Sequence, residues 1–360
     1  MTTYLSPQWI DVARVLVRHS TAVQKGDRCV IIMREADTFP LMRAVYQEIV
    51  RFGGLPQVLF KSSYLESDLM RLGTQEQVEW VPELYAQAMD WADVCIDLRG
   101  TANLYEAVDV NAGAFTAHRR AEGAVSSLRT RKTRWTICRV PNDLFGQQAR
   151  ITTQEAMDLF FRATTIDWEE EKIRLDRLRD RYNGTREVRI ETPDTNLVFS
   201  TAGRTFIVDD GHINNPGGEI FTAPVEDSVS GHISFSNPGV FGGVLIEGIR
   251  LRFVDGRVTD ASTASHEDLL FELLDMDEGS RRVGEFGIGT NRMIQSFSND
   301  IFYDEKIAGT IHIALGRSYS ECGGKNDSAL HWDIVKDLRP GGVVYFDDKP
   351  LIRDGDLLEQ

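Results

Sequence analysis

The sequence lacks the features that mark several classes of protein. Its 360 residues include four cysteines, Cys29, Cys95, Cys138 and Cys322, which are scattered and form no CxxC pair. This pattern excludes a disulfide framework and a cysteine-based zinc site. No window approaches 18 uninterrupted apolar residues, so we expect no membrane span.

Positive charge is also scarce. The chain has 40 Lys and Arg against 55 Asp and Glu, which gives a net charge of −15 at pH 7. Nucleic-acid binding and docking on anionic membranes both need a basic face, so we expect neither partner. Residues 1–20 read as an amphipathic helix interrupted by Asp11 and Arg14, without a small-residue cleavage site after an apolar run. They are therefore no signal peptide, and we expect a cytoplasmic protein.

In the first half of the chain, short apolar runs alternate with helical patterns. This alternation predicts an α/β domain with a doubly wound parallel sheet. No GxGxxG follows the first strand, so we predict no dinucleotide site. The predicted strands are 29–33, 56–60, 92–98 and 134–140, and the predicted helices are 7–23, 37–52, 66–91 and 104–124.

A long helix over 153–182 ends at Asn183-Gly184, where we place the domain boundary. The predicted domains are therefore 1–184 and 185–360. After residue 185, short alternating strands and frequent turns indicate a β-rich (α+β) domain, a curled antiparallel sheet or barrel. One helix is expected at 265–277.

The histidines of the segment 301–333 indicate metal chemistry. His312 lies in the apolar run Ile311–Leu315, where an imidazole needs a polar partner. His331 and Asp333 are two residues apart, so on a strand both side chains leave the same face. An imidazole and a carboxylate on one face form half of a first-row metal site. The alternatives are a hydrogen-bonded core histidine at 312 and a His331 that Asp333 merely orients.

Two acidic residues of the second domain follow or adjoin glycines. Glu219 emerges from Pro216-Gly217-Gly218, and Glu285 follows Gly284. Each acid by itself could be an ordinary turn residue. Gly287 and Gly289 alone are a weak phosphate-loop signal, and we draw nothing from them.

Taken together and in order, these motifs resemble the aminopeptidase T/aminopeptidase S family of dinuclear metallo-aminopeptidases. The resemblance spans the whole second domain and, more loosely, the first. The matching pieces are Gly218-Glu219-Ile220-Phe221-Thr222-Ala223-Pro224, Gly284-Glu285, His312-Ile313-Ala314-Leu315-Gly316, Tyr319, and Asn326-Asp327-Ser328 before His331 and Asp333.

The resemblance implies that two divalent ions (Zn, Co or Mn) are bound in the second domain. The implied ligands are Glu219, Glu285, His312, Tyr319, His331 and Asp333. It also implies a peptide or small-molecule substrate, a water activated between the ions, and a homodimer. The general base stays unassigned, because all these acids are committed to metal. The segment between Tyr319 and His331 is shorter than in many peptidases of the family.

Two other functions stay open. Ring-cleaving dioxygenases of the 2,5-dihydroxypyridine type resemble this family and use one Fe(II), here held by His312, His331 and Asp333. A metal-binding or structural protein without activity is the other alternative. The neighbouring Asp304, Glu305 and Lys306 could support the ligands or be plain surface charge.

Overall fold

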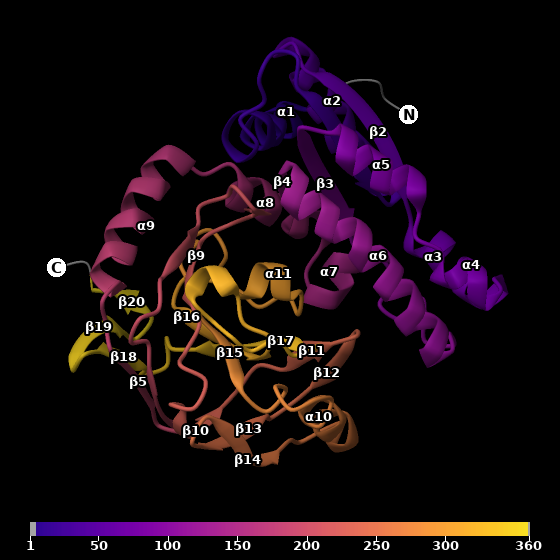
Figure 1. The fold of residues 1–360 in the computed structure, drawn as a ribbon. Helices are drawn as coiled ribbons and strands as arrows, with labels where there is room; N and C mark the ends of the chain where they lie inside the picture. Colours follow the sequence, from indigo (N-terminus) through magenta and orange to yellow (C-terminus); the bar gives the residue numbers. More distant parts are fainter. Residues whose placement is uncertain (1–4, 359–360) are drawn as a thin grey trace. The chain divides into compact units, whose positions relative to one another are not determined.

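The computed structural model describes residues 5–358 and divides into two compact units (Figure 1). The first unit contains the chain up to Trp168 together with Gly211–Gly217. The second contains Glu169–Asp210 and the chain from Gly218 onward.

The sheet of the first unit is parallel, as predicted. Its strand order is β2-β1-β3-β4-β8, and each neighbouring pair is parallel. The first four strands match the predicted ones to within two residues, whereas the fifth was not predicted. The strands are β1 (Arg28–Arg34), β2 (Leu55–Lys61), β3 (Val94–Gly100), β4 (Arg134–Val140) and β8 (Asn214–Asn215).

Helices cover both faces of this sheet, which confirms the doubly wound architecture. Ile31 and Ile96 face a core built with Leu16, Leu41 and Phe160, while the opposite face packs on the helices that carry Met89 and Val125. The helical elements are α1 (Pro7–Arg14), η1 (Val15–Ser20), η2 (Ala36–Thr38), α2 (Phe39–Arg51), α3 (Ser63–Leu72), α4 (Gln75–Glu79), α5 (Glu83–Trp91), α6 (Ala112–Lys132), α7 (Asp143–Ala149) and α8 (Thr153–Thr164).

Several predicted helices were wrong at their ends. The helix predicted at 66–91 is three helices, interrupted at Gly73 and at Pro82. The helix predicted to begin at 104 begins at 112, because the Asn111 side chain caps it by accepting a bond from the Gly113 N–H at 2.8 Å. The helix predicted at 153–182 is broken after α8.

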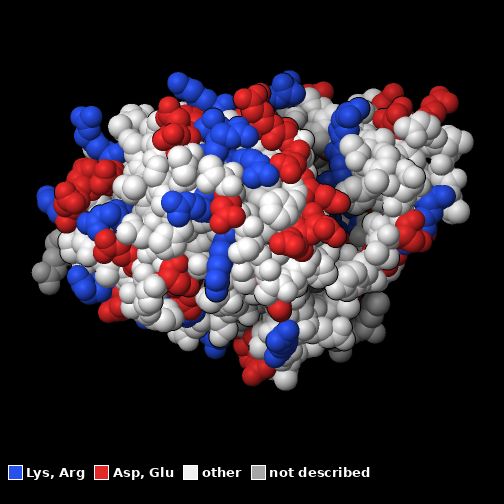
Figure 2. All heavy atoms as spheres, turned by 90° about the horizontal axis from the view of Figure 1, so that it is seen from below, with Lys and Arg blue, Asp and Glu red and all other residues white. Residues whose placement is uncertain are grey.

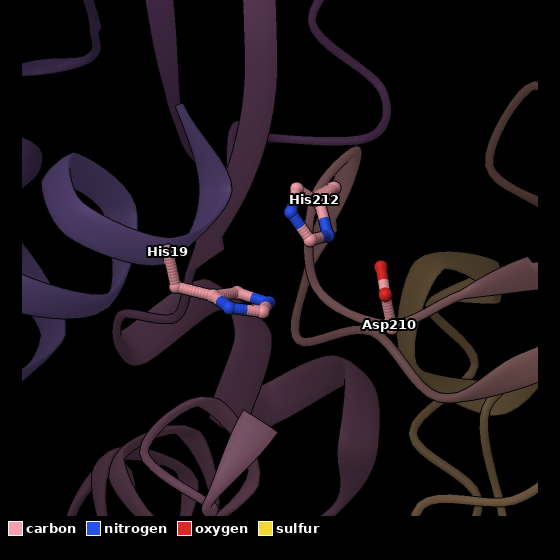
Figure 3. A group of neighbouring side chains, drawn as sticks. All are labelled: His19, Asp210 and His212. Carbon is pink, nitrogen blue, oxygen red and sulfur yellow. The ribbon is translucent and has the colours of Figure 1, made fainter. Parts of the chain in front are cut away.

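The strand β8 pairs with β4 at the edge of the first unit's sheet, and side-chain bonds add to this pairing. The Asn215 amide donates to Ser20 Oγ at 3.1 Å and to Thr136 Oγ1 at 2.9 Å. Figure 3 shows His212, from the same segment, beside His19, with ring centroids 4.3 Å apart. These contacts place 211–217 with the first unit, although the chain has already entered the second.

A buried carboxylate with three cations lies in this sheet. Asp97 of β3 is fully buried and accepts bonds from Arg34 at 2.9 Å, Arg99 at 3.1 Å and Arg129 at 2.9 Å. Burial acts to raise the pKa of Asp97, but the three guanidinium groups outweigh it and lower the pKa to about 2. This negative charge is therefore neutralised by the protein itself.

The second unit begins one helix earlier than the predicted boundary at 184. Leu175, Leu178 and Tyr182 of α9 (Trp168–Tyr182) belong to the core of the second unit. The helix therefore belongs to the unit on which its apolar residues pack. The remaining helical elements are α10 (Glu267–Leu274), α11 (Ile301–Asp304) and η3 (Ser320–Cys322), and α10 lies within the predicted helix.

Two large antiparallel sheets and one two-stranded sheet form the β-rich unit, in place of one curled sheet or barrel. The first has the order β14-β13-β10-β6-β5-β18-β19-β20 and the second β17-β16-β15-β9-β7. The strands of the first are β5 (Glu187–Thr192), β6 (Thr195–Ser200), β10 (Ser230–Ser234), β13 (Arg250–Val254), β14 (Arg257–Ser262), β18 (Val343–Phe346), β19 (Lys349–Arg353) and β20 (Asp356–Leu357). Those of the second are β7 (Ile207–Asp209), β9 (Glu219–Thr222), β15 (Val283–Gly289), β16 (Thr310–Gly316) and β17 (His331–Asp337), and β11 (Gly239–Phe241) pairs with β12 (Val244–Ile246).

The core of the second unit lies between these sheets. Phe199 of β6 packs on Phe286 of β15 with ring centroids 5.1 Å apart, and Ile288 and Ile313 join the same core. Side chains alternate along a strand, so the neighbours of Phe286 and Ile313 face away from this core.

The surface carries both signs of charge. Acidic and basic side chains are interspersed on the face drawn in Figure 2. Among the residues that the structure describes, no helix has the length and apolar character needed to cross a membrane.

Candidate metal centre

Four neighbouring strands present acids and imidazoles on one face of the five-stranded sheet. Glu285 and Asp333 both pair with Ala314, so these three residues form one row across β15, β16 and β17. His312 and His331 lie two residues from this row and therefore on the same face. Glu219, the first residue of β9, pairs with Gly289 of β15 and joins them. This face is the one turned away from the core.

A glycine makes room for His312. Gly287 is the register partner of His312, and a Cβ atom at Gly287 would lie 2.1 Å from Nε2 and Cε1 of the imidazole. The ring therefore lies across β15 at a residue without a side chain. This close approach is the physical reason for Gly287, which as sequence was only a weak phosphate-loop signal.

The donor atoms form two adjoining groups. Glu219, Glu305 and His312 make up the first, and within it His312 Nε2 is 3.6 Å from Glu219 Oε2. Glu285, His331 and Asp333 make up the second. His331 Nε2 is 3.4 Å from Glu285 Oε2 and 3.4 Å from Asp333 Oδ2, while Glu285 Oε1 is 3.6 Å from His312 Nε2. Glu285 thus lies between the two histidines and links the groups.

These spacings fit ligands of common ions. Donor atoms that are each about 2.1 Å from one ion lie about 3.0–3.5 Å from one another, which exceeds the usual hydrogen-bond length. Both nitrogens of His312, Glu219 Oε2 and Asp333 Oδ1 are buried without a hydrogen-bond partner. Buried polar atoms are costly unless satisfied, so a cation between them is the arrangement that the donor set favours.

The second histidine is held in the orientation of a ligand. His331 Nδ1 lies 2.8 Å from the carbonyl oxygen of Arg317, to which a neutral imidazole donates its proton. The lone pair then belongs to Nε2, the nitrogen that faces Glu285 and Asp333. A backbone carbonyl behind a histidine commonly fixes its orientation and raises its basicity as a ligand.

The charge of the site is not balanced by the protein. Among the described residues, Lys306 is the one lysine whose ammonium lies within 4 Å of any of the four carboxylates Glu219, Glu285, Glu305 and Asp333. Its Nζ is fully buried and lies 2.6 Å from Glu219 Oε1 and 2.7 Å from Glu305 Oε1. With all four carboxylates ionised and both imidazoles neutral, the protonation states of metal ligands, four negative charges would face one positive charge. Such a surplus inside a protein calls for bound cations.

The pKa values reflect burial first and the neighbouring charges second. Burial raises the pKa of Glu219 to about 8, and the ammonium of Lys306 offsets only part of that rise. Burial also acts to raise the pKa of Glu285, but the imidazoles of His312 and His331 outweigh it and lower the pKa. The pKa of Lys306 is raised well above its usual value, because its three acidic neighbours outweigh desolvation.

The remaining predicted residue, Tyr319, borders the second group. Its ring lies 5.3 Å from that of His331 and 5.6 Å from that of Phe221. Desolvation and the carboxylates of Glu285 and Asp333 raise the pKa of Tyr319 above its usual value. The structure therefore brings all six predicted ligands to one face of one sheet or to its margin.

Sequence reasoning left three neighbours unresolved. Glu305 and Lys306 turn into the site, whereas Asp304 accepts bonds from Ser298 and Asn299 and shapes the turn before α11. Asp304 and Lys306 are both buried, so their roles differ through the partners that they face, and these depend on how the segment 298–307 packs. The spacing of residues along the sequence carries no information about which of the three side chains enters the site.

The match to a family model and to curated relatives identifies the chain as a metal-dependent hydrolase. The chain belongs to the family of thermophilic metalloproteases (M29), whose model matches residues 6–355. This membership confirms the resemblance found in the motifs. Aminopeptidase 2 of Geobacillus stearothermophilus is 31% identical over 297 residues, which cover 67% of this chain and 70% of that protein.

Two solved structures share the fold. Wild-type AmpT from Thermus thermophilus has a TM-score of 0.81 at 24% identity, covering 98% of this chain and 99% of that one. The 2,5-dihydroxypyridine dioxygenase from Pseudomonas putida KT2440 has a TM-score of 0.67 at 14% identity, covering 97% and 96%. At these identities the likenesses establish the architecture of the chain.

Proposed function

We propose that this chain, a metal-dependent aminopeptidase, removes the N-terminal residue of peptides with a water molecule activated between two divalent ions of Zn, Co or Mn. The observation that carries the proposal is the pair of adjoining donor groups joined by Glu285, whose two oxygens face the two histidines at 3.6 and 3.4 Å. A carboxylate in this position suits a bridge between two ions.

The ligand set divides between the two groups. Glu219 and His312 would hold the first ion, His331 and Asp333 the second, and Glu285 both. Tyr319 would complete the second group from the margin of the sheet. When bound, the two ions would lower the pKa of a shared water toward neutrality and polarise the carbonyl of the peptide bond.

Other residues of the chain support this chemistry. Lys306 holds Glu219 Oε1 at 2.6 Å and thereby aims the second oxygen of Glu219 at His312. Glu305 is the carboxylate of the first group outside the six predicted ligands, and its Oε1 is occupied by Lys306 at 2.7 Å. We assign Glu305 as the general base, which takes the proton of the attacking water on Oε2.

The dioxygenase alternative gives a metal partner to fewer of the buried carboxylates. One Fe(II) bound by His312, His331 and Asp333 would leave the carboxylates of Glu219 and Glu285 without a second cation. The charge surplus therefore favours two ions, and with them hydrolysis.

Elemental analysis of the purified protein, with assays on aminoacyl-p-nitroanilides, tests the proposal. We expect at least two equivalents of zinc, cobalt or manganese per chain and metal-dependent hydrolysis. One equivalent of iron with substrate-dependent oxygen uptake would overturn it. Glu305→Gln should retain the metal and lose about a hundredfold or more in kcat, and full activity in this variant would remove Glu305 from the mechanism.

The proposal also includes a homodimer in the cytoplasm. The four cysteines are free and buried in the structure, which suits a reducing compartment. Sedimentation at micromolar concentration and cell fractionation would check these two points.

A further inference from the structure

A second cluster of metal-ligand side chains lies in the first unit, separate from the centre described above. His118 and Glu122 are four residues apart on α6 and so share one face of that helix. Glu66 of α3 faces them, and one donor atom from each residue lies within 4.8 Å of the others. An imidazole and two carboxylates at such spacing match a set of ligands for a first-row divalent ion.

The imidazole of this cluster has an unsatisfied nitrogen. His118 is 6% exposed, and its Nε2 is buried without a hydrogen-bond partner. The same nitrogen lies 4.0 Å from Glu66 Oε2, which is too far for a hydrogen bond. A buried imidazole nitrogen aimed at a carboxylate across a gap is costly unless something occupies that gap.

The two acids are accessible to solvent, and the pKa of one of them is lowered. Burial acts to raise the pKa of Glu66, but His118 and Lys61 outweigh it and lower the pKa, so this side chain is ionised at neutral pH. The side chains of Glu66 and Glu122 are 32% and 20% exposed, which leaves an ion a way in from solvent.

A lysine competes for the same carboxylates. Lys61 Nζ pairs with Glu122 and lies 3.9 Å from Glu66 Oε1. It also lies 4.8 Å from the ring centroid of Tyr85, which attracts a cation through its π face. The four-carbon stem of lysine is flexible, so the ammonium can shift toward Tyr85 when another cation arrives.

We propose that Glu66, His118 and Glu122 form a zinc site that joins α3 to α6. In this site Zn²⁺ replaces the Lys61 ammonium as the main counter-charge of the two carboxylates, and water completes its coordination. The imidazole ligand favours zinc over Mg²⁺ and Ca²⁺, which prefer oxygen donors. This inference does not depend on the proposed function of the other unit.

The experiment counts zinc equivalents in full-length protein dialysed against a fixed concentration of free Zn²⁺. We expect His118→Ala to hold one equivalent less than the wild type while kcat/KM on aminoacyl-p-nitroanilides stays the same. His118→Gln keeps the size of the side chain and should lose the same equivalent, with an unchanged circular dichroism spectrum. His232→Ala, which removes an exposed histidine of β10, is the control and should lose none.

Lys61→Met gives an independent arm. Removing the competing ammonium should tighten the zinc that depends on His118 by about tenfold, measured by competition with a chromogenic chelator. The proposal is overturned if His118→Ala and His118→Gln both hold as much zinc as the wild type. It is also overturned if the equivalent that they lose comes with loss of hydrolysis, since that zinc would belong to the other centre.

Discussion

The two units treat buried negative charge in opposite ways. In the first unit, the single carboxylate of Asp97 has three guanidinium partners within 3.1 Å. In the second, the ammonium of Lys306 contacts two of the four carboxylates, Glu219 and Glu305, and among the described residues no other lysine or arginine lies within 4 Å of the four. The first cluster is complete as a protein structure, whereas the second needs cations from outside.

This difference separates a structural ion cluster from a metal centre. Both clusters are buried and rich in acids, so neither burial nor acid content distinguishes them. The balance of charge does, together with the donor atoms that lack partners, such as both nitrogens of His312.

The strongest test removes a ligand from the uncompensated cluster. Glu219→Ala should lose one metal equivalent and reduce kcat/KM by at least about a thousandfold, because the first ion of the proposed pair would lose a carboxylate and the shared water would lose its activation. Metal content by mass spectrometry and hydrolysis assays would check this. Wild-type metal content with full activity would rule out the assignment of Glu219.

The matching test removes the negative charge from the Asp97 cluster of the first unit. Asp97→Asn leaves three buried or half-buried guanidinium groups without their carboxylate and should destabilise the first unit by about 3–5 kcal/mol. Urea unfolding would measure this change. Asp68→Asn, which alters an exposed acid of α3, is the control. If Asp97→Asn instead lost metal while keeping its stability, the contrast between the clusters would fail.

A third test acts on the shape of the metal centre and leaves its charge alone. Gly287→Ala places a Cβ atom 2.1 Å from the His312 ring, which must move. We expect weaker metal binding and about a hundredfold lower activity. Gly123→Ala, at an exposed helical glycine with nothing within 4 Å, should keep full activity and stabilise α6 by up to about 1 kcal/mol. Equal activity of the two variants would contradict the close approach of His312.

The smallest expected effect is a loss of folding stability at low pH. The pKa of Asp97 in the folded protein is about 2, below its ordinary value of 3.8. A lowered folded pKa stabilises the protein above the ordinary pKa, and this stabilisation is lost as the pH falls from about 4 to about 2. The loss should amount to about 2 kcal/mol and be missing in Asp97→Asn. Equal acid slopes in both proteins would argue against it.

The fold could be predicted where burial leaves a pattern in the sequence. The run Cys29–Met33 is apolar because its strand is covered on both faces, and it was found without the structure. The strand Asn214–Asn215 has no such pattern, because amide hydrogen bonds to Ser20 and Thr136 fix it in place. The sequence therefore contains no sign that this segment forms the edge strand of the first unit's sheet.

The residues of the site also divide into those that the sequence indicates and those that only the fold shows. The six ligand candidates were identified through motifs in a fixed order along the chain. The roles of Gly287, Glu305 and Lys306 depend on which strands become neighbours and what they bury. These are contacts between distant segments, and short-range spacing carries no information about them.

The pairing of β16 with β17 has a consequence for folding. His331 and Asp333 are placed by the register Gly316↔His331 and Ala314↔Asp333. A slip by one residue would turn both side chains into the opposite face. Only a chain whose strands from residue 219 to residue 333 have paired correctly would therefore bind the ions tightly. By linkage, a higher concentration of free ion shifts the folding equilibrium toward the chain with that register. The metal would therefore select the correctly paired sheet over a slipped one.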